Sequence, residues 1–420
     1  MSNNVVLLGN IAILKTGPFG TQLSASEYVN EGIPVINVRN IGYGEIITSD
    51  LEYVGTETAQ RLHEHLLYKG DIVFGRKGSV DRHAFIDNRY DGWMQGSDCI
   101  RVRINEGINP HFISHYLKLG SVKKQINSSA VGSTMASLNT DILSRIQIVL
   151  PSLEIQNRIE ELLSVIEEKI DLNTRLCIEL ESMAKTLYDY WFMQFDFPVE
   201  NGKPYRSSGG AMEWCQELRR EVPKGWKAGM VADLGEIVSG ATPSTAEENY
   251  YATDGIAWIT PNDLSDSEHN MFIFHGERDI TEAGLNSCSA VLMPAGSVLM
   301  SSRAPIGYLA IAANSVCTNQ GFKSIICNKD YGTLFVYYTL KRNVQGIARQ
   351  GVGTTFKEVS RDTLARYTIL LPDTTIAERF EQLIAPISQT RKKCEQENRE
   401  LSSLRDWFLP MLMNGQLQVK

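Results

Sequence analysis

Two histidines that stand four residues apart raise the question of a metal site. His111 and His115 lie in a segment with helical character, where residues i and i+4 share one face. A zinc protease would carry a glutamate directly after the first histidine, but this chain has Phe112 there. Histidine pairs without that motif are far more often surface or packing residues, so we predict no metal site.

Loops that would hold a nucleotide or a methyl donor are not found in the sequence either. The segment from Gly75 to Ser79 is rich in glycine and basic residues, but it lacks the GxxxxGK[ST] spacing, and no GxGxxG follows a strand. Asn109-Pro110-His111-Phe112 has the wrong third residue for the catalytic loop of an amino-methyltransferase. We therefore expect a non-catalytic chain that binds no cofactor of its own.

Polar loops flanked by glycine occur at matching places in the two halves of the chain. Their Arg, Asn, Gln and Ser side chains are the types that reach base edges and phosphates. Polar loops occur on every protein, so any one of these residues is as often structural as ligand-binding. Gln95 and Gln320, each followed by glycine, are equally suited to bracing a loop. The candidate DNA contacts are Lys15, Thr16, Gln22, Arg39, Asn40, Arg76, Lys77, Ser79, Arg82 and His83 in the first half, and Thr242, Ser244, Thr245, Asn262, Asp263, Ser302, Arg303 and Tyr308 in the second.

The elements that must position these loops are written twice. Residues 5–192 recur in diverged form about 221–226 positions later. A chain made of two such copies imitates a two-fold dimer, which suits a ligand with two similar halves, and duplex DNA is the commonest such ligand. Matching pairs include Leu8-Gly9 with Leu234-Gly235, Gln95-Gly96 with Gln320-Gly321, and Pro151 with Pro372.

Each copy begins with short strand patterns broken by Gly, Asn and Ser, which indicates an α+β unit. In the first copy we expect strands at 34–41, 71–75, 99–104 and 146–150, and a helix at 111–127. In the second copy we expect strands at 256–260, 297–301, 322–327 and 367–371, and a helix at 334–345.

A long helix with a heptad pattern follows each unit, and the shared register of the two patterns predicts that the helices pair as an antiparallel coiled coil. Lys169 and Asn173 interrupt the first seam, and Thr390 and Glu397 the second, so these polar breaks would face each other. Pro386 should kink the second helix. The apolar positions are Ile155, Ile159, Leu162, Ile166, Leu176, Leu180, Met183, Leu187 and Tyr190, then Ile376, Phe380, Leu383, Ile387, Cys394, Leu401, Leu404 and Phe408.

These patterns divide the chain into five segments. The predicted architecture is two α+β recognition domains, each followed by a long helix, in a pseudo-two-fold arrangement. The Pro/Gly/Ser-rich stretch between the halves is expected to be a linker that lets the second half fold back. The bounds are 1–151 for the first domain, 152–194 for its helix, 195–229 for the linker, 230–372 for the second domain and 373–420 for its helix and tail.

Composition limits the choice of partners. The net charge of −8 argues against tight DNA binding by this chain alone, although residues 152–192 and 373–413 carry most of that charge, so a basic face elsewhere remains open. No run of about 18 apolar residues predicts a transmembrane helix. Seven cysteines without a CxxC pair favour a reducing, cytoplasmic location.

The chain resembles the specificity subunits of type I restriction–modification enzymes over essentially its whole length. The first half carries the wording GDIVFGRKGSV, GSTMASLNTDIL, LPSLEIQNRI and YDYWF, and the second half carries ATPSTAEENYY, NQGFKSI, GTTFKEVSRDTL and ERFEQLIAPI. Pro386 departs from the uninterrupted helix of that family. The resemblance implies that each domain reads one half of a split, asymmetric DNA target, and that the helix pair sets the gap between the halves.

The resemblance also implies partners. The helices would dock two modification subunits, which bring S-adenosylmethionine and methylate adenine, and two restriction subunits would add translocation and cleavage with ATP and Mg²⁺. Two alternatives remain open at this point. One is a specificity-like subunit of a defence methyltransferase without a nuclease partner. The other is a structural adaptor whose domains bind protein.

Overall fold

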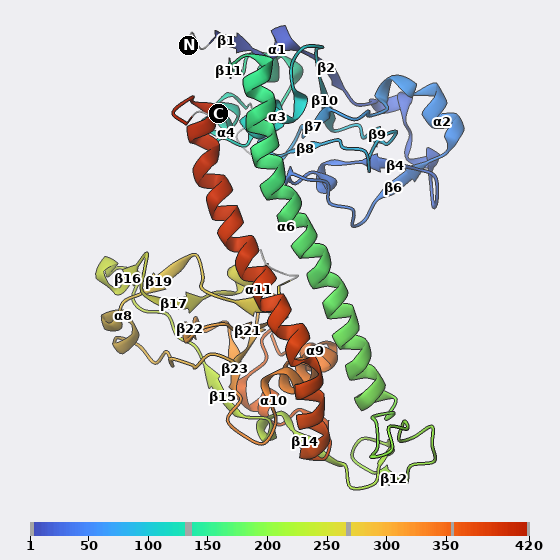
Figure 1. Cartoon of the computed structure of the whole chain (residues 1–420), viewed down its shortest axis with the longest axis vertical. Helices are drawn as coiled ribbons and strands as arrows, with labels where there is room; N and C mark the ends of the chain where they lie inside the picture. The colour runs from blue at the N-terminus through green and yellow to red at the C-terminus, as the bar shows by residue number, and fades with distance from the viewer. Residues whose placement is uncertain (1–3, 131–136, 266–269, 354–356, 418–420) are drawn as a thin grey trace. The chain divides into compact units, whose positions relative to one another are not determined.

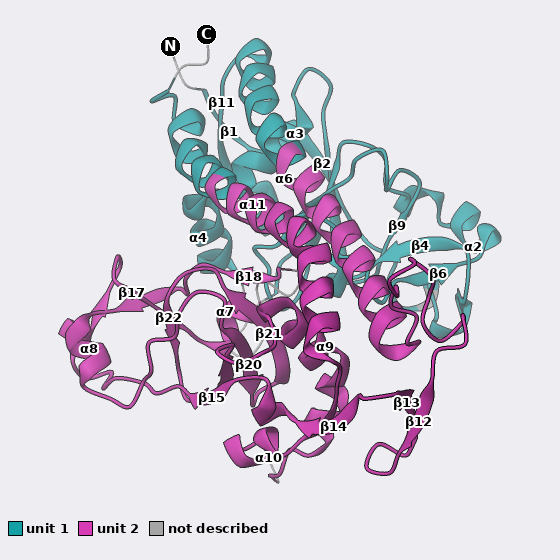
Figure 2. Cartoon of the chain, turned by 60° about the horizontal axis from the view of Figure 1, so that its bottom comes forward, with its two compact units in different colours: residues 1–168, 401–420 teal, residues 169–400 magenta. Residues whose placement is uncertain are grey.

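The computed structural model describes residues 4–130, 137–265, 270–353 and 357–417. The chain divides into two compact units, which Figure 2 colours separately. Unit 1 combines residues 1–168 with 401–420, and unit 2 comprises residues 169–400. Both long helices therefore contribute one part to each unit. Within the described ranges, no helix is long and apolar enough to cross a membrane.

Unit 1 holds three sheets built from short strands (Figure 1). The five-stranded sheet has the order β2-β10-β7-β8-β5, the four-stranded sheet the order β3-β6-β4-β9, and β1 pairs with β11. The strands are β1 (Asn4–Leu7), β2 (Ala12–Thr16), β3 (Tyr28–Val29), β4 (Ile33–Ile36), β5 (Tyr43–Gly44), β6 (Glu52–Val54), β7 (Asp71–Gly75), β8 (His83–Phe85), β9 (Met94–Gln95), β10 (Cys99–Ile104) and β11 (Gln147–Leu150), with helices α1 (Leu8–Ile11), α2 (Thr56–Arg61), α3 (Pro110–Leu117), α4 (Gly120–Ser129), α5 (Thr140–Ser144) and α6 (Leu153–Tyr188).

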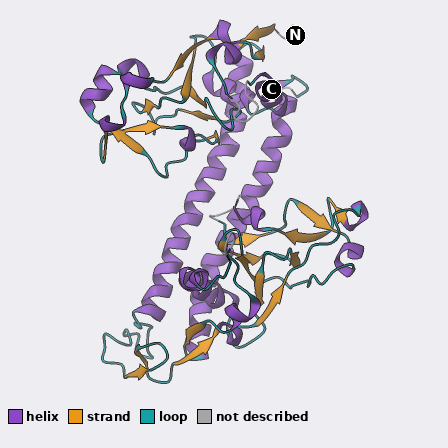
Figure 3. Ribbon diagram, turned by 180° about the vertical axis from the view of Figure 1, so that it is seen from behind, coloured by secondary structure: helices purple, strands orange, loops and turns teal. Residues whose placement is uncertain are grey.

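Unit 2 repeats this topology strand for strand. Its sheets are β15-β23-β20-β21-β18, β16-β19-β17-β22 and β14-β24, so the predicted duplication holds at the level of the fold. Figure 3 shows the strands of both units in orange. The elements are β14 (Lys227–Met230), β15 (Glu236–Ser239), β16 (Tyr251–Ala252), β17 (Ile256–Ile259), α7 (Pro261–Ser265), β18 (Phe272–Ile273), β19 (Arg278–Ile280), α8 (Glu282–Asn286), β20 (Val298–Ser302), β21 (Ile306–Ala312), β22 (Val316–Thr318), β23 (Lys323–Ile326), α9 (Thr333–Arg349), α10 (Arg361–Ala365), β24 (Thr368–Leu371) and α11 (Thr374–Met413).

Most expected elements are present, and two expectations in the first half are wrong. The strand predicted at 34–41 ends at Ile36, because Asn37 begins a 3₁₀ turn in which its backbone N–H donates to Asn40 Oδ1 at 3.1 Å. The helix predicted at 111–127 is two helices, α3 and α4. Leu119 between them has an extended backbone (φ −58°, ψ 135°), and Gly120 starts the second helix.

The two long helices form the expected antiparallel pair, and part of the predicted seam is wrong. In unit 1, Ile159 and Leu163 of α6 share a core with Leu409 and Leu412 from the end of α11. In unit 2, Tyr188 near the end of α6 shares a core with residues from the start of α11. Five predicted seam residues are instead exposed: Leu176 (42%), Met183 (54%), Tyr190 (37%), Leu383 (46%) and Leu404 (40%).

Polar residues take the middle of the helix pair. The predicted meeting of the polar breaks is confirmed for Asn173, whose Nδ2 donates to Glu397 Oε2 at 2.7 Å, and for Lys169, whose Nζ lies 3.1 Å from the same oxygen. Thr390 does not join them, because its side chain is exposed and its hydroxyl donates to the Pro386 carbonyl at 2.9 Å.

A buried ionic cluster, formed by Glu181, Arg391, Glu395 and Lys341, ties both helices to the globular part of unit 2. Glu181 Oε2 accepts a bond from Arg391, and Glu181 Oε1 lies 2.6 Å from Lys341 Nζ on α9. Arg391 NH2 also lies 3.2 Å from Glu395 Oε1. Glu395 accepts the backbone N–H groups of Met271 and Phe272, at 3.0 and 2.8 Å.

Neither proline in α11 ends the helix, which runs continuously from Thr374 to Met413. Pro386, which was expected to kink it, lies inside this continuous stretch. Just beyond the last helical residue, Gly415 has a left-handed φ of 70° and donates its N–H to the Leu412 carbonyl at 3.1 Å, which caps the helix end.

The stretch predicted as a loose linker is ordered within unit 2. It contains the hairpin of β12 (Met212–Cys215) and β13 (Arg220–Pro223). Phe195, Phe197 and Trp226 are buried, with Phe197 stacked on Trp226 at 5.3 Å between ring centroids. The glycines and serines that suggested flexibility form turns between these aromatic anchors.

The ionic cluster generates a stability prediction. Arg391→Ala should lower the free energy of unfolding by about 3–5 kcal/mol, because it leaves the buried Glu395 carboxylate without its cation. Urea unfolding followed by far-UV circular dichroism measures this loss. Arg175→Ala is the matched control, since Arg175 is 64% exposed in a surface pair with Asp171, and it should cost less than about 1 kcal/mol. Equal losses in the two variants would contradict the assigned role of the cluster.

Candidate nucleic-acid interface

The topology of unit 1 brings two of the predicted polar loops to one edge of a sheet. β10 lies between β2 and β7 and is antiparallel to both, with Thr16 opposite Ile100 and Gly75 opposite Cys99. The chain therefore leaves β2 and β7 at the edge where β10 begins. Backbone bonds hold the loops there, from Gly17 N–H to the Cys99 carbonyl at 2.9 Å and from Arg76 N–H to the Asp98 carbonyl at 2.8 Å.

Two arginines on these loops stand over aromatic rings. The Arg76 guanidinium lies 4.7 Å from the centroid of the Phe19 ring, and that of Arg82 lies 5.1 Å from the centroid of the Tyr43 ring. In the part of the chain that the structure describes, neither arginine has a carboxylate partner, and the Nε of each lacks a hydrogen bond. Their charge is therefore available to an anionic ligand.

The other predicted cations of unit 1 already have acidic partners. Lys15 pairs with Glu64, Arg39 NH2 lies 3.1 Å from Glu52 Oε1, and Lys77 Nζ lies 3.1 Å from Asp98 Oδ1. Ser79 and Gln22 are exposed, and Gln22 Oε1 accepts the N–H of Phe19 at 3.2 Å. The carbonyl of Thr16 accepts a bond from Gln95 Nε2 at 3.2 Å.

Two predicted contacts of unit 1, and also Gln95, lie inside the fold. Asn40 donates to the carbonyls of Ile47 and Ser49, both at 3.0 Å, and His83 Nε2 lies 3.0 Å from the Ser114 carbonyl. Gln95 is fully buried and braces the loop after β2, which is the structural alternative considered for it. A direct contact of Asn40 or His83 with DNA does not fit this burial, so we correct that expectation to a bracing role.

Unit 2 builds an equivalent edge with the same strands. β23 lies between β15 and β20, and backbone bonds run from Ala241 N–H to the Thr318 carbonyl at 2.9 Å and from Ser302 N–H to the Gly321 carbonyl at 2.7 Å. Thr242 donates its hydroxyl to Gln320 Oε1 across this edge. The two halves thus agree in their strand order, although Gly17 is anchored on β10 and Ala241 is anchored on β22.

The charges at the edge of unit 2 are more nearly balanced. Arg303 NH1 lies 4.0 Å from Glu358 Oε2, and Lys323 Nζ lies 3.4 Å from Glu358 Oε1. Arg303 also forms a β-bridge with Glu358, as Lys77 does with Ser137 in unit 1. One carboxylate therefore faces both cations that lie closest to the ends of β20 and β23.

The remaining predicted residues of unit 2 differ in exposure. Ser244, Thr245 and Asn262 are exposed, and Tyr308 is half-buried. Asp263 accepts the backbone N–H of Thr260 at 2.6 Å and that of Glu277 at 2.7 Å, so it holds a turn. Ser302 is fully buried and donates to the Gly321 carbonyl at 3.0 Å, which corrects the expectation that its side chain reaches a ligand.

Four residues of these edges were not predicted from the sequence. The rings of Phe19 and Tyr43 lie under the guanidinium groups of the two arginines, and the carboxylates of Asp98 and Glu358 pair with cations. A signal for Glu358 was present, since it lies in the GTTFKEVSRDTL segment that matches GSTMASLNTDIL. The glycine–serine–threonine parts of both segments lie largely outside the described residues.

Known proteins give the context for this duplicated edge. A family model described as the type I restriction modification DNA specificity domain matches residues 3–182 and 223–397. The chain belongs to this family.

Relatives within the type I specificity family agree with that assignment. The MjaIX specificity subunit of Methanocaldococcus jannaschii is 36% identical over 200 residues, which is 45% of each chain, so that match spans less than half of the relative. The HindI specificity subunit of Haemophilus influenzae is 26% identical over 407 residues, covering 83% of this chain and 87% of the relative. The solved S subunit of a type I system from M. genitalium shares the fold, with a TM-score of 0.58 at 13% identity over 97% of this chain and 95% of that one.

Burial of His83 makes unit 1 sensitive to acid. Burial, together with the nearby positive charge of Lys118, lowers the pKa of His83 to about 3. Unfolding restores a pKa of about 6.5, so the unfolded chain binds the proton first. The stabilising contribution of neutral His83 is therefore complete above pH 6.5 and is lost as the pH falls toward 3, by up to about 1.4 kcal/mol per pH unit.

Urea unfolding between pH 7.5 and 5 tests this dependence. The wild-type chain should lose stability more steeply than His83→Gln, whose side chain does not titrate. Parallel curves for the two proteins would show that His83 is not the group that responds.

Proposed function

We propose that this chain is the DNA-reading subunit of a type I restriction–modification complex and that each unit recognises one half of a split, asymmetric target. The observation that carries the proposal is the sheet edge built twice from the same strands, with polar loops at each copy. Two equivalent edges on one chain match a target with two half-sites.

The arginines are the best candidates for direct readout. Arg76 and Arg82 project from loops held by backbone bonds, and their aromatic supports restrict the guanidinium planes. A guanidinium in a fixed orientation can bond to two acceptors of guanine in the major groove or to a phosphate. In unit 2 the corresponding candidate is Arg303, which shares Glu358 with Lys323.

The long helices offer surface to protein partners. On α6, Leu172, Leu176 and Met183 are exposed by 56%, 42% and 54%, although they are apolar. Exposed apolar side chains along one helix are typical of protein-binding surfaces. We propose that two modification subunits dock along the helices and supply S-adenosylmethionine, and that two restriction subunits supply ATP-driven translocation and cleavage with Mg²⁺. The acidic balance of this chain is then offset by the partners when DNA is bound.

Two other functions are distinguishable from this one. A specificity-like subunit of a defence methyltransferase without a nuclease would read DNA in the same way. A gene for a motor subunit beside the gene for this chain would exclude that alternative. A structural adaptor would bind protein through the polar edges and show no preference for a DNA sequence.

Reconstitution with the cognate modification subunit tests the proposal. The complex should methylate adenine at one split DNA sequence, identified by single-molecule sequencing of the methylated bases. The purified chain alone should transfer no methyl group. Methylation by the chain alone, or a complex without any sequence preference, would refute the proposed role.

Arginine variants test the assignment of half-sites. Arg76→Ala should weaken recognition of one half-site and Arg303→Ala recognition of the other, each by about 1–3 kcal/mol if a bidentate contact with guanine is lost. A lost phosphate contact would instead weaken binding to all sequences and reduce the salt dependence by about one counterion. Fluorescence anisotropy with duplexes altered in one half-site at a time measures both quantities.

Matched variants complete that experiment. Arg145→Ala removes the arginine at the C-terminal cap of α5, and Arg361→Ala removes the first residue of α10. Both lie outside the clustered loops, so both variants should leave binding unchanged. Glu358→Gln should strengthen binding to DNA of any sequence, because it frees the charge of Arg303 and Lys323. If Arg76→Ala and Arg303→Ala alter the same half-site, the assignment of one unit to each half-site is wrong.

A further inference from the structure

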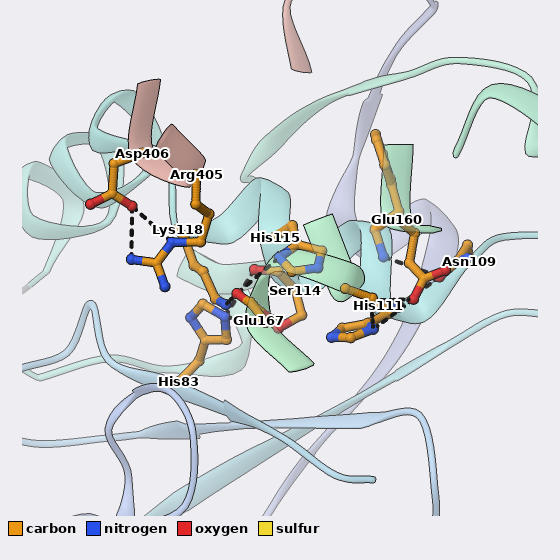
Figure 4. A network of polar contacts seen from close by, with 12 residues as sticks. His83, Asn109, His111, Ser114, His115, Lys118, Glu160, Glu167, Arg405 and Asp406 are labelled. Carbon is orange, nitrogen blue, oxygen red and sulfur yellow. Dashed lines mark hydrogen bonds and ion pairs between the residues drawn. The ribbon is translucent and has the colours of Figure 1, made fainter. Parts of the chain in front are cut away.

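A cluster of imidazole and carboxylate groups lies between α3 and α6 in unit 1 (Figure 4). His111 and His115 of α3 share one helix face, with ring centroids 4.5 Å apart. Phe85 stacks on His111 at 4.3 Å between centroids. Glu160 and Glu167 of α6 face these rings, at 3.0 Å from Glu160 Oε1 to His111 Nδ1 and 3.7 Å from Glu167 Oε1 to His115 Nδ1.

His115 is the unusual member of this cluster. It is fully buried, and neither of its ring nitrogens has a hydrogen bond to any residue that the structure describes. Buried polar groups normally have partners, because leaving one without a bond costs free energy.

We propose that His111, His115 and Glu167 bind a divalent transition-metal ion, with zinc as the best chemical match. Two imidazole nitrogens and one carboxylate oxygen are a recurring donor set for Zn²⁺. One ligand atom from each of the three residues lies within 4.8 Å of the others. Small side-chain rotations that move each donor atom by about 1 Å would bring the three donors to the separation that metal–ligand bonds of about 2.0–2.2 Å require.

Glu160 supplies the outer support that such sites use. Its Oε1 lies 3.0 Å from His111 Nδ1 and accepts the Ser164 hydroxyl at 2.7 Å. The Ser164 hydroxyl is itself 3.4 Å from His111 Nδ1. A carboxylate at Nδ1 places the proton there and leaves Nε2 free for the metal, as in many carboxylate–histidine–metal arrangements.

Lys118 occupies the position of a competing cation. Its Nζ lies 2.7 Å from Glu167 Oε1, so it neutralises this carboxylate when no metal is bound. Lys118 also lines a pocket of about 330 Å³ with Tyr43, Lys123 and Arg405, which gives its flexible stem room to move away. A metal ion must displace this ammonium, so Lys118 sets the affinity of the site.

Metal titration of the full-length chain tests the site. Zn²⁺ is titrated in competition with a chromophoric chelator, and Co²⁺ is followed by its visible absorption, which reports the ligand geometry. We expect one ion per chain, and a rise in the unfolding temperature on adding Zn²⁺, since the ion would join α3 to α6. Absence of stoichiometric binding would overturn the proposal.

Variants separate the site from adventitious binding. His111→Ala and Glu167→Gln should each weaken binding by more than 100-fold, and Glu160→Gln by about 10- to 100-fold. His63→Ala is the matched control, because His63 is an exposed histidine of unit 1 bonded to the Gln60 carbonyl, and it should bind like the wild type. Equal affinities of wild type and His111→Ala would refute the site. These variants avoid His115, whose replacement alters a buried core.

Lys118→Met gives an outcome that a purely structural cluster does not predict. Removing the ammonium should tighten Zn²⁺ binding by about tenfold, which corresponds to one pK unit of electrostatic interaction. An unchanged affinity would exclude Glu167 from the ligands and overturn the three-ligand arrangement. The readout is independent of DNA recognition, so its failure would leave the proposed function untouched.

Discussion

Antiparallel pairing of one central strand with two flanking strands determines where the candidate DNA contacts lie. β10 in unit 1 and β23 in unit 2 each begin at the edge where two neighbours end. The two loops on either side must then emerge together, whatever residues they contain. Backbone bonds anchor these loops in each unit. The loop sequences can therefore diverge while the edge that presents them is kept by the sheet.

The periodic elements were predictable because their patterns are local. β7 and β10 have the predicted bounds, and the duplication predicted from short matches holds for the strands of the sheets that both units contain. The break between α3 and α4 was not predictable from periodicity, since it depends on the extended backbone of Leu119. Pro386 lies inside α11, which runs continuously from Thr374 to Met413, so the loss of one backbone bond does not end this helix.

The site was predictable only in outline, for a reason that the arginines illustrate. Residue type suggested contacts for Arg76 and His83 alike, but one stands over an aromatic ring and the other is buried against Ser114. Long-range partners such as Phe19 and Glu358 decide which side chains keep their charge available. Part of the predicted heptad seam is wrong for the same reason. Leu176 and Met183 fit the heptad, but Asn173, Cys177 and Ala184 are the residues that the fold buries.

The ionic cluster of unit 2 makes the helix pair unequal, although the chain is a duplication. At the repeat offset of 221, Arg391 corresponds to Ile170, Glu395 to Thr174 and Glu181 to Ser402. The arginine and its two carboxylates thus exist in one copy each. If α6 paired with α6 of a second chain, Glu181 would meet isoleucine in place of Arg391 and would be buried without its cation. The cluster therefore favours pairing of α6 with α11 over pairing of α6 with the α6 of a second chain.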